Sequence, residues 1–596
     1  MRGINVTKRR LPAFAATLAL LLASPALATP AQDLAQLMEE HWQWSLAESP
    51  TLATSVGDHR YDDQLGDPSI AAMDRRAAQE QAFLARLDAI PETGLSDSER
   101  VNRQILHRLL SDDIEGNRFG QRLMVFTSYY SPWQGLAGLG EDTAFRNKAD
   151  YENYLRRLAR FPANNDILLD ITRQAIARHY VQPCVTLGGL EQSIRGVITD
   201  DPAKSRFYAP FAGQRPGTVS AADWQALQAQ ARALITDQLN PAYGKAADFM
   251  VSDYIPHCTR DVGVSAAPDG AAFYAFRIRA ETTTDLTPQQ IHQIGLDEVA
   301  RIEAEMVQVA HAAGFADKAS FVQKLRTDPA YYATTPEDLL RAASRVAKTI
   351  DGQMPRYFHM LPRLPYGIRE IPAEIAEGTT TAYYSPGSPD TGLAGNYYVN
   401  TSKLDQRPLW ELPALTAHEA VPGHHNQIAL QQELDLPPMR RHLSFFTAFV
   451  EGWGLYAERI GIEMGLYDTP EKQFGRLSYE MWRACRLVVD TGIHSMGWSK
   501  EQAVAFMTRH TALSDANIDA EVNRYISWPG QALAYKLGEL KIRALRARAE
   551  TALGERFDLA AFHDAVLGQG ALPLDVLEQQ IDGWIATQKA KAPVAR

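Results

Sequence analysis

The chain has 596 residues, of which 45% are hydrophobic and 22% charged, a balance that indicates a folded globular protein and excludes a disordered one. Acidic residues (71) outnumber Lys and Arg (60), and the resulting net charge of −11 excludes a basic nucleic-acid-binding protein. Three cysteines exclude both a disulfide framework and a cysteine-rich metal site. The length allows about two to four domains, or one large helical body.

The first 28 residues have the pattern of a secretory signal peptide. Basic residues precede an apolar run over residues 11–23, and a small-x-small triplet, Ala26-Leu27-Ala28, follows it. The run is too short to cross the ~30 Å hydrocarbon core of a membrane, and no cysteine follows it that would accept a lipid anchor. We therefore expect cleavage after Ala28 and a periplasmic or secreted protein without stable membrane insertion.

The rest of the chain predicts a mainly α fold. We divide it into a helical N-terminal half, residues 29–270, and a catalytic half, residues 271–596, within what we expect to be one continuous helical body. In the N-terminal half, a stretch rich in Gly and Pro at residues 185–217 predicts loops between helices. The helical patterns there cover residues 32–112, 151–179 and 221–252.

Capping residues mark the starts of helices in the catalytic half. Thr287 and Ser499 each begin a capping box with Gln three residues later, and Thr335 precedes Pro and two acidic residues. One region differs from the helical pattern, because residues 379–401 hold two β-branched and aromatic runs around a loop of Ser, Pro, Gly and Asp. This region predicts a β-hairpin.

A cluster of histidines follows the hairpin. Residues 415–430 hold three of the 15 histidines of the chain, and Glu419 directly follows the first of them, His418. In the pattern His-Glu-x-x-His on a helix, the two imidazoles lie one turn apart and bind Zn²⁺, and the Glu acts as general base. This sequence departs from the pattern, because the residue four positions after His418 is Pro422.

The departure leaves two candidates for the second histidine ligand. On an undistorted helix His424 would point about 120° away from His418, and His425 would lie about two turns further along the axis. However, Pro422 cannot donate the helical hydrogen bond, and Gly423 tolerates unusual backbone angles. A two-residue bulge would bring His424 into the one-turn position, so we favour His424 and keep His425 as the alternative.

We expect the third ligand on a second helix. Residues 447–464 predict a helix on which Glu451 and Glu458 share one face. Phe and Trp residues surround Glu451 in the sequence, which argues against an exposed carboxylate. We therefore assign Glu451 as the third protein ligand of one zinc ion per chain, and Glu458 as a residue that orients a ligand histidine.

Three motifs of the chain resemble one family. They are His-Glu-Ala-Val-Pro-Gly-His-His, Glu-Gly-Trp-Gly-Leu-Tyr-Ala-Glu and Arg-Tyr-Ile-Ser-Trp-Pro-Gly-Gln-Ala-Leu-Ala-Tyr-Lys-Leu-Gly. In this order they resemble the bacterial "domain of unknown function 885" family, over nearly the whole chain after the signal peptide. That family is similar to zinc peptidases of the angiotensin-converting-enzyme, thimet-oligopeptidase and Taq-carboxypeptidase types, whose motif is His-Glu-x-Gly-His. Aligning the Gly-His pairs matches Gly423 and His424 and leaves a two-residue insertion.

The resemblance implies hydrolysis of short peptides in a deep channel of a helical body, with the hairpin beside the metal helix. Zn²⁺ would lower the pKa of a water molecule, and Glu419 would accept its proton and pass it to the leaving amine. The C-terminal motifs add polar candidates. Oxyanion donors could be His494, Tyr525 and Tyr535. A substrate carboxylate could be clamped by Arg524 or Lys536. Along an edge strand, the hairpin could bind substrate backbone at Tyr397 and Tyr398.

Other interpretations stay open from the sequence. A zinc amidohydrolase that acts on a non-peptide amide or a strained ring would have the same ligands. A catalytically inactive peptide-binding protein could keep the fold, although the intact Glu419 argues against it. A cysteine hydrolase would need Cys485 and His494 but lacks an oxyanion motif. A purely structural role for three imidazoles and a carboxylate would make a costly core.

The three cysteines differ in context. Cys184 and Cys258 lie in Pro-containing, loop-like segments and could pair in an exported protein. Cys485 lies in an apolar helical stretch, which predicts a buried free thiol.

Overall fold

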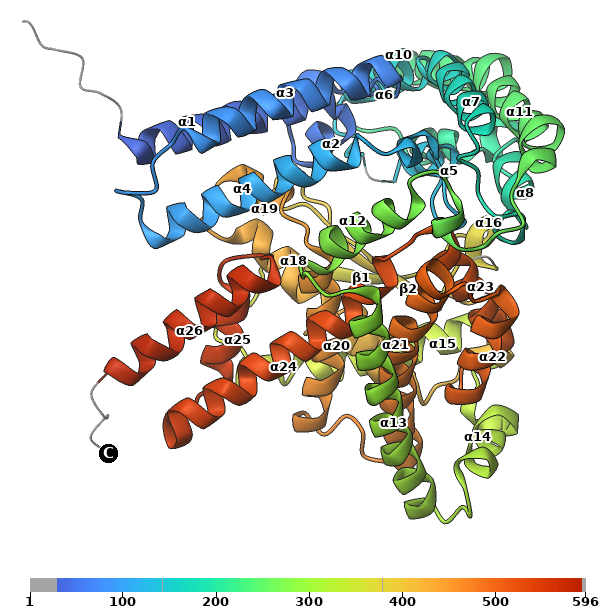
Figure 1. Ribbon diagram of the computed structural model, residues 1–596. Helices are drawn as coiled ribbons and strands as arrows, with labels where there is room; N and C mark the ends of the chain where they lie inside the picture. The colour runs from blue at the N-terminus through green and yellow to red at the C-terminus, as the bar shows by residue number, and fades with distance from the viewer. Residues whose placement is uncertain (1–28, 142, 378, 592–596) are drawn as a thin grey trace, which may run out of the picture.

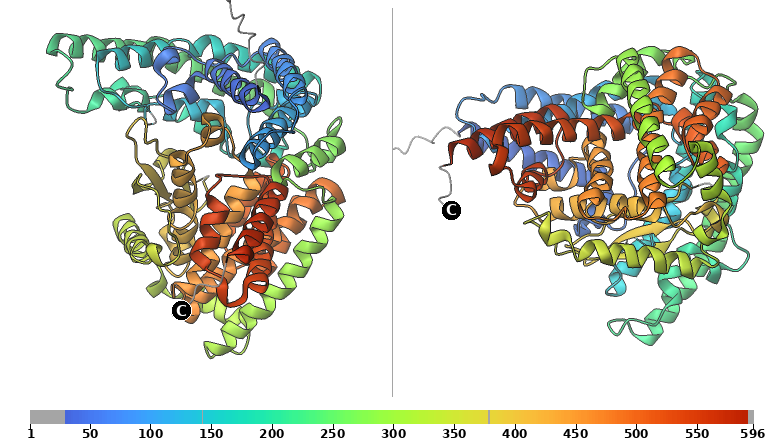
Figure 2. Two further views of the ribbon diagram at one scale, coloured as in Figure 1. Left: turned by 90° about the vertical axis from the view of Figure 1, so that its left-hand side faces the viewer. Right: turned by 90° about the horizontal axis from the view of Figure 1, so that it is seen from below.

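Two layers of helices make up the protein (Figures 1 and 2). The computed structural model describes residues 29–141, 143–377 and 379–591, so the predicted signal peptide, residues 1–28, lies outside the described part. The upper layer in Figure 1 runs from α1 (Pro30–Glu48) to α11 (Asn240–Phe249), and most of the remaining chain forms the lower layer. The mainly α fold with a small sheet is therefore confirmed.

The upper layer contains shorter helices than its sequence pattern predicts, and helices also interrupt the expected loops. The predicted loop region at residues 185–217 includes two short helices, and the predicted helix at residues 221–252 is divided by a π-helical segment. A disulfide between Cys184 and Cys258, with Cα atoms 5.0 Å apart, closes this region. Besides α1 and α11, the helices are α2 (Pro50–Ser55), α3 (Ile70–Asp88), α4 (Asp97–Gly116), α5 (Pro132–Gly138), α6 (Lys148–Leu158), α7 (Phe161–Ala177), α8 (Leu190–Arg195), α9 (Ala209–Ala212) and α10 (Ala221–Leu234).

The lower layer begins where the predicted caps place its helices. The capping boxes at Thr287 and Ser499 are both present, and the Thr335 hydroxyl accepts the N–H of Asp338, which confirms all three predicted starts. The helices are α12 (Gly270–Thr282), α13 (Pro288–Ala312), α14 (Lys318–Thr327), α15 (Pro336–Asp351), α16 (Ala373–Ala376), α17 (Leu412–Glu419), α18 (His424–Glu433), α19 (Pro438–His442), α20 (Thr447–Glu463), α21 (Pro470–Met496), α22 (Lys500–His510), α23 (Asp515–Ser527), α24 (Ala534–Leu553), α25 (Leu559–Leu567) and α26 (Leu574–Ala590).

The main hydrophobic core joins both layers. Apolar residues of α1, α3 and α4 pack in the same cluster as residues of α13, α20, α21 and α24, whereas residues 126–254 form a second cluster of their own. Residues on both sides of position 270 thus share one core. Helix α21 lies at its centre: every residue from 474 to 494 is buried, including the predicted free thiol of Cys485.

A three-stranded sheet lies beside the lower helices. Strand β2 (Ala382–Ser385) pairs antiparallel with β3 (Gly395–Val399), which confirms the predicted hairpin. Strand β1 (Tyr366–Glu370) was not predicted from the sequence, and it pairs parallel with β3 on its other side. The strand order β1-β3-β2 makes β3 the central strand and leaves β2 at an edge.

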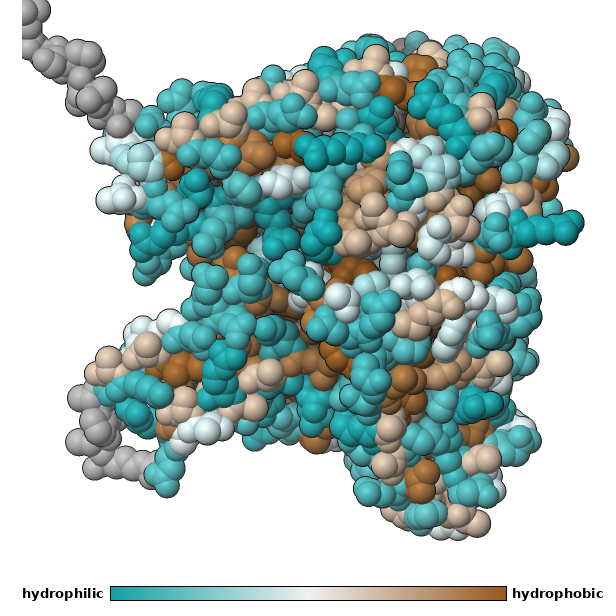
Figure 3. Space-filling view, in the orientation of Figure 1, coloured by the Kyte–Doolittle hydropathy of each residue, from teal (hydrophilic) through white to brown (hydrophobic). Residues whose placement is uncertain are grey.

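The face seen in Figure 3 is mainly hydrophilic. Apolar residues are scattered over this face, and the outline is indented between the layer of α1, α3 and α4 and the helices α24 to α26 (Figures 1 and 3). Within the described ranges, none of the helices combines the length and the apolar character needed to cross a membrane.

Candidate metal centre

The helix that carries His418 is interrupted where the sequence departs from His-Glu-x-x-His. Helix α17 ends and α18 begins with a four-residue connection between them, in which the Val421–Pro422 peptide bond is cis. The predicted bulge within one helix is therefore wrong, because the chain leaves the helix and restarts it. Pro422 has no N–H to continue the helical ladder. A Cβ atom on Gly423 would lie only 1.8 Å from the carbonyl oxygen of His418, so this return of the chain requires glycine.

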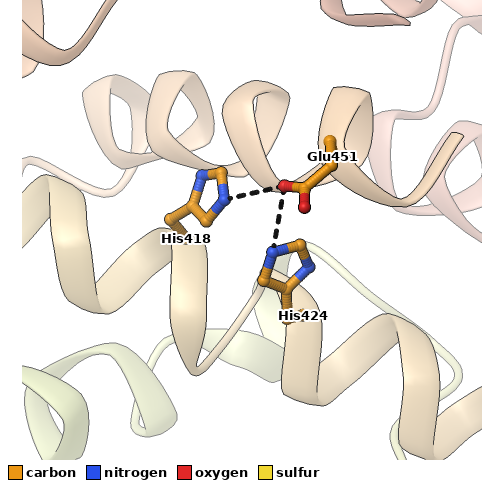
Figure 4. Close-up of side chains that lie close together, drawn as sticks. All are labelled: His418, His424 and Glu451. Carbon is orange, nitrogen blue, oxygen red and sulfur yellow. Dashed lines mark ion pairs between the residues drawn. The ribbon is translucent and has the colours of Figure 1, made fainter. Parts of the chain in front are cut away.

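The interruption places His424 beside His418, with ring centres 4.6 Å apart. Glu451 approaches both rings from α20 (Figure 4). Its Oε2 atom lies 3.4 Å from Nε2 of His418 and 3.3 Å from Nε2 of His424. The three candidate ligand atoms all lie within 4.8 Å of one another. The structure thus brings together the three side chains that the sequence assigned as ligands.

The spacing of these atoms fits a zinc ion. Tetrahedral ligands at ~2.0–2.1 Å from zinc lie about 3.3–3.4 Å from each other, which matches the two nitrogen–oxygen distances. The Oε2 atom of Glu451 is buried and has no hydrogen-bond partner in the described chain, and an unsatisfied buried carboxylate oxygen is costly. Two imidazoles and one Glu are also a known donor set of catalytic zinc sites. The residues present therefore fit the ion.

Glu458 fixes the orientation of the first imidazole. Nδ1 of His418 lies 2.8 Å from Oε1 of Glu458, which leaves Nε2 to face Glu451. Arg483 pairs with the same Glu458 oxygen at 3.1 Å. Burial alone would lower the pKa of His418, but the carboxylates of Glu451 and Glu458 beside its ring outweigh burial and raise this pKa to about 9. A carboxylate on the outer nitrogen is the usual partner of a metal-binding histidine.

Contacts in the structure explain each residue of the motif Glu451-Gly452-Trp453-Gly454. A Cβ atom on Gly454 would lie 2.8 Å from Cε1 of His418, so α20 can pass the imidazole only with glycine there. A Cβ atom on Gly452 would lie 2.5 Å from Cα of Gly538, where α20 crosses α24. The indole N–H of Trp453 donates to the carbonyl of Pro422 at 2.8 Å and so ties α20 to the helix interruption.

The three candidate ligands, His418, His424 and Glu451, line a cavity of about 360 Å³ and are named the metal cluster from here on. The side chains of Glu419, Arg524 and Tyr535, all predicted site residues, line this cavity together with the three candidate ligands. Edge strand β2 forms another wall, whereas no residue of its pairing partner β3 lines the cavity. A Glu next to the first histidine, at the wall of a cavity, can act on a water molecule bound there.

Three residues that were predicted to donate to an oxyanion or to bind a substrate carboxylate do not line the cavity: His494, Tyr525 and Lys536. Both ring nitrogens of His494 are used in the fold: Nδ1 accepts the N–H of Val264, and Nε2 contacts the carbonyl of Tyr525, each at 3.0 Å. Burial lowers the pKa of His494 to about 4. The Tyr525 hydroxyl accepts the indole N–H of Trp482 and lies in the core. Lys536 is fully buried among carboxylates. These positions correct the prediction that the three residues contact substrate.

The hairpin tyrosines also differ from the prediction. Tyr397 and Tyr398 lie on the central strand β3, whose backbone is paired on both sides, so neither offers an edge to a substrate. Tyr397 instead packs in the core with its hydroxyl 3.5 Å from that of Thr416 on α17. His425 points away from the metal cluster, and its Nδ1 lies 2.9 Å from the hydroxyl of Tyr384. Burial lowers the pKa of His425 to about 4.

Tyr129 and Arg486 are among the cavity residues that sequence reasoning missed. Arg486 had a detectable signal, because it lies in an apolar stretch of helix where a charged side chain has no solvent. The same criterion had identified Glu451. Tyr129 comes from the connection before α5, more than 280 residues from His418 in the chain, and no local pattern marks it.

The chain matches a known family over most of its length. The family described as "Bacterial protein of unknown function (DUF885)" covers residues 50–581. The chain belongs to the DUF885 family. The match confirms the resemblance that the three motifs indicated.

Two solved structures share the fold of this DUF885 chain. A crystal structure from Colwellia psychrerythraea, described as "the putative lipoprotein", is 28% identical with a TM-score of 0.87, and the match covers 94% of this chain and all of that chain. A structure from Shewanella oneidensis, described as "a putative lipoprotein of unknown function", is 21% identical with a TM-score of 0.68, covering 93% of this chain and 99% of that chain. The second likeness concerns the fold alone. No curated protein matches the chain.

Proposed function

We propose that this DUF885 protein is an exported zinc-dependent metallopeptidase that hydrolyses short peptides. The observation that carries the proposal is the convergence of His418, His424 and Glu451 at the wall of a cavity that Glu419 also lines. A metal ion held there would be exposed to a substrate bound in the cavity. The edge strand β2 at the same wall supports a peptide as that ligand, because an extended chain can pair with a free strand edge.

The chain's own residues have defined tasks in this reaction. His418, His424 and Glu451 would hold the ion, and Zn²⁺ supplies Lewis-acid chemistry that polarises a carbonyl and lowers the pKa of water. The carboxylate of Glu419 accepts the proton of the attacking water and later delivers it to the leaving amine nitrogen. Tyr535 lines the cavity and accepts a hydrogen bond from Gln531 at 3.3 Å, so its own proton is available to an oxyanion.

A digest of a peptide library, read by mass spectrometry, tests the proposal with and without a chelator. Glu419→Gln keeps the size of the side chain but removes the base, so we expect about one zinc per chain and a loss of hydrolysis of roughly 10²–10⁴-fold. Glu555→Gln, an exposed position outside the cavity, makes the same charge change and should hydrolyse like the wild type.

The outcomes separate the alternatives. Hydrolysis by Glu419→Gln at the wild-type rate would show that Glu419 is not the base. If neither protein cleaves any peptide and both hold zinc, the protein acts on a non-peptide amide or only binds its ligand.

Export is part of the proposal. The signal-peptide pattern of residues 1–28 and the disulfide between Cys184 and Cys258 support an oxidising compartment such as the periplasm. The two similar structures are each described as a putative lipoprotein. Because no cysteine directly follows the apolar run of residues 11–23 in this chain, we propose export without a lipid anchor. N-terminal sequencing of the exported protein should begin near Thr29.

A further inference from the structure

Two arginines line the same cavity as the metal cluster. Arg486 belongs to α21 and Arg524 to α23, and both side chains are buried. Both pair with one oxygen of Glu521, at 2.9 and 2.8 Å, and Glu521 is itself 0% exposed. Two guanidinium groups therefore share one carboxylate. This arrangement, called the arginine cluster below, carries an excess positive charge at the cavity wall.

The arginine cluster also keeps unused hydrogen-bond donors. Arg486 gives its Nε proton to the Tyr525 hydroxyl at 2.9 Å, and Arg524 gives an Nη1 proton to Gln531 at 2.7 Å. Nη1 of Arg486 and Nε of Arg524 are buried, and no described residue accepts their protons. A buried charge with unsatisfied donors is costly unless an anion completes the site. A carboxylate matches the planar fork of a guanidinium group.

Tyr535 connects the arginine cluster to the metal cluster. Its ring is stacked with the His418 ring at a centroid distance of 6.4 Å, and Cζ of Arg486 lies 4.0 Å from the centre of the same tyrosine ring. With separations of 6.4 and 4.0 Å, Arg486 can lie no more than about 10 Å from the imidazole. An extended chain spans ~3.3–3.6 Å per residue, so this reach corresponds to at most about three residues.

We propose that Arg486 and Arg524 bind a carboxylate of the peptide substrate and thereby set the cleavage site within one to three residues of it. The inference rests on the proposed function and names its substrate class. In the hydrolysis, water gives its OH to the carbonyl carbon and its remaining proton passes to the leaving nitrogen, so the C–N bond breaks without any further reactant. With a C-terminal carboxylate in the arginine cluster, the released product is one to three residues long. An acidic side chain at the same distance presents the same group.

The neighbouring cavities are consistent with this direction of binding. A cavity of about 530 Å³ adjoins the site and gives room for the N-terminal part of a substrate; the two cavities share Pro386, Ile428, Phe445 and Val450. A third cavity, of about 540 Å³, meets the site cavity at Trp528 alone among the described residues. The indole of Trp528 lies 6.2 Å from the ring of Tyr129, and the two aromatic rings flank the arginine end of the cavity.

Three matched peptides test the inference with the zinc-loaded protein: a neutral peptide with a free C-terminus, its C-terminal amide, and the amide with Glu as the last residue. For the free acid we expect kcat/KM roughly 10²-fold above the neutral amide, with products of one to three residues. If the Glu amide is cleaved as well as the acid, the arginine cluster binds a side-chain carboxylate as well as a C-terminal one, which supports the inference. Equal rates for all three peptides would overturn the inference while leaving peptide hydrolysis intact.

Binding to zinc-loaded Glu419→Gln, measured by calorimetry, gives a readout that does not need turnover. If the wild type cleaves no peptide, the proposed function fails. The inference still stands if the acid binds roughly 10²-fold more tightly than the neutral amide, and it is overturned if the two bind alike.

A variant assigns the preference to the arginine cluster. Arg524→Gln leaves Glu521 paired with Arg486, so no buried charge loses its partner and folding is retained. We expect the ratio between acid and neutral amide to fall from roughly 10² to roughly 10. Arg341→Gln, at a side chain that is 68% exposed on α15, should keep the wild-type ratio. An unchanged ratio in Arg524→Gln would remove Arg524 from the site.

Discussion

Two buried charged clusters in the lower layer differ in the spacing of their atoms. Around Nζ of Lys536, carboxylate oxygens of Glu298, Glu480 and Glu539 lie at 2.9, 3.0 and 2.9 Å. Around Oε2 of Glu451, the two imidazole nitrogens lie at 3.4 and 3.3 Å and form no hydrogen bond with it. The ammonium group of Lys536 thus has carboxylate partners at hydrogen-bonding distance within the protein. His418, His424 and Glu451 instead have the spacing of groups that share a ligand.

Residue type alone does not separate a structural cluster from a binding site. Lys536 and Glu451 are both charged residues within apolar helical sequence, and the sequence analysis gave both a role in the site. Burial would raise the pKa of Glu480, but Lys536 and the neighbouring arginines outweigh it and hold that pKa well below its usual range. Lys536 thus stabilises the fold, and only the geometry shows it.

The largest expected effect concerns Lys536 and its three carboxylate partners. Lys536→Met removes the ammonium that three buried carboxylates share, and breaking a buried ion pair from one side costs about 3–5 kcal/mol of unfolding free energy. Urea unfolding of variant and wild type measures this loss, and the zinc content should stay near one per chain. Lys348→Met, at a side chain that is 84% exposed, should leave the unfolding midpoint in place. A stable Lys536→Met protein with impaired hydrolysis would return Lys536 to the site.

The next effect concerns the metal cluster of His418, His424 and Glu451. His424→Ala removes one of three zinc donors, so zinc affinity should fall by more than ~10²-fold, since even the outer partners of ligands contribute 10–100-fold. His425→Ala is the matched control, because His425 contacts Tyr384 and not the metal cluster. Competition with a chromophoric chelator measures both affinities. Zinc loss in His425→Ala but not in His424→Ala would mean that the two histidines exchange roles on metal binding.

The features that could be predicted from sequence are local ones. The capping boxes at Thr287 and Ser499 depend on residues three positions apart, and the β2–β3 hairpin joins strands that are close in the chain. The grouping of His418, His424 and Glu451 could also be predicted, because each of them lies in a short motif within an apolar helix. The form of the interruption could not, since a bulge and a restart of the helix both bring His424 to His418.

The features that were missed depend on contacts between distant segments. Strand β1 pairs with β3 across 24 intervening residues, and nothing in its own sequence separates it from a loop. The arginine cluster exists because α21 and α23 place Arg486 and Arg524 on one carboxylate, Glu521. A sequence pattern shows that a charge is buried, but it does not show whether its partners are complete.

The smallest effect concerns His494, both of whose ring nitrogens have partners within the fold. Its pKa in the fold is about 4, because it is buried, against ~6.5 in the unfolded chain. Between these two values the unfolded state binds the proton and the folded state does not, so stability is fully present above about pH 6.5 and is lost as the pH falls toward 4. The loss is about 1.4 kcal/mol per pH unit for one proton. We expect His494→Gln to make the slope of unfolding free energy against pH shallower by this amount, with the exposed His257→Gln as control. The pH profile of kcat/KM should not move, because both nitrogens of His494 contact backbone groups outside the cavity. A shifted activity profile with an unchanged stability slope would show that His494 acts in the site and not in the fold.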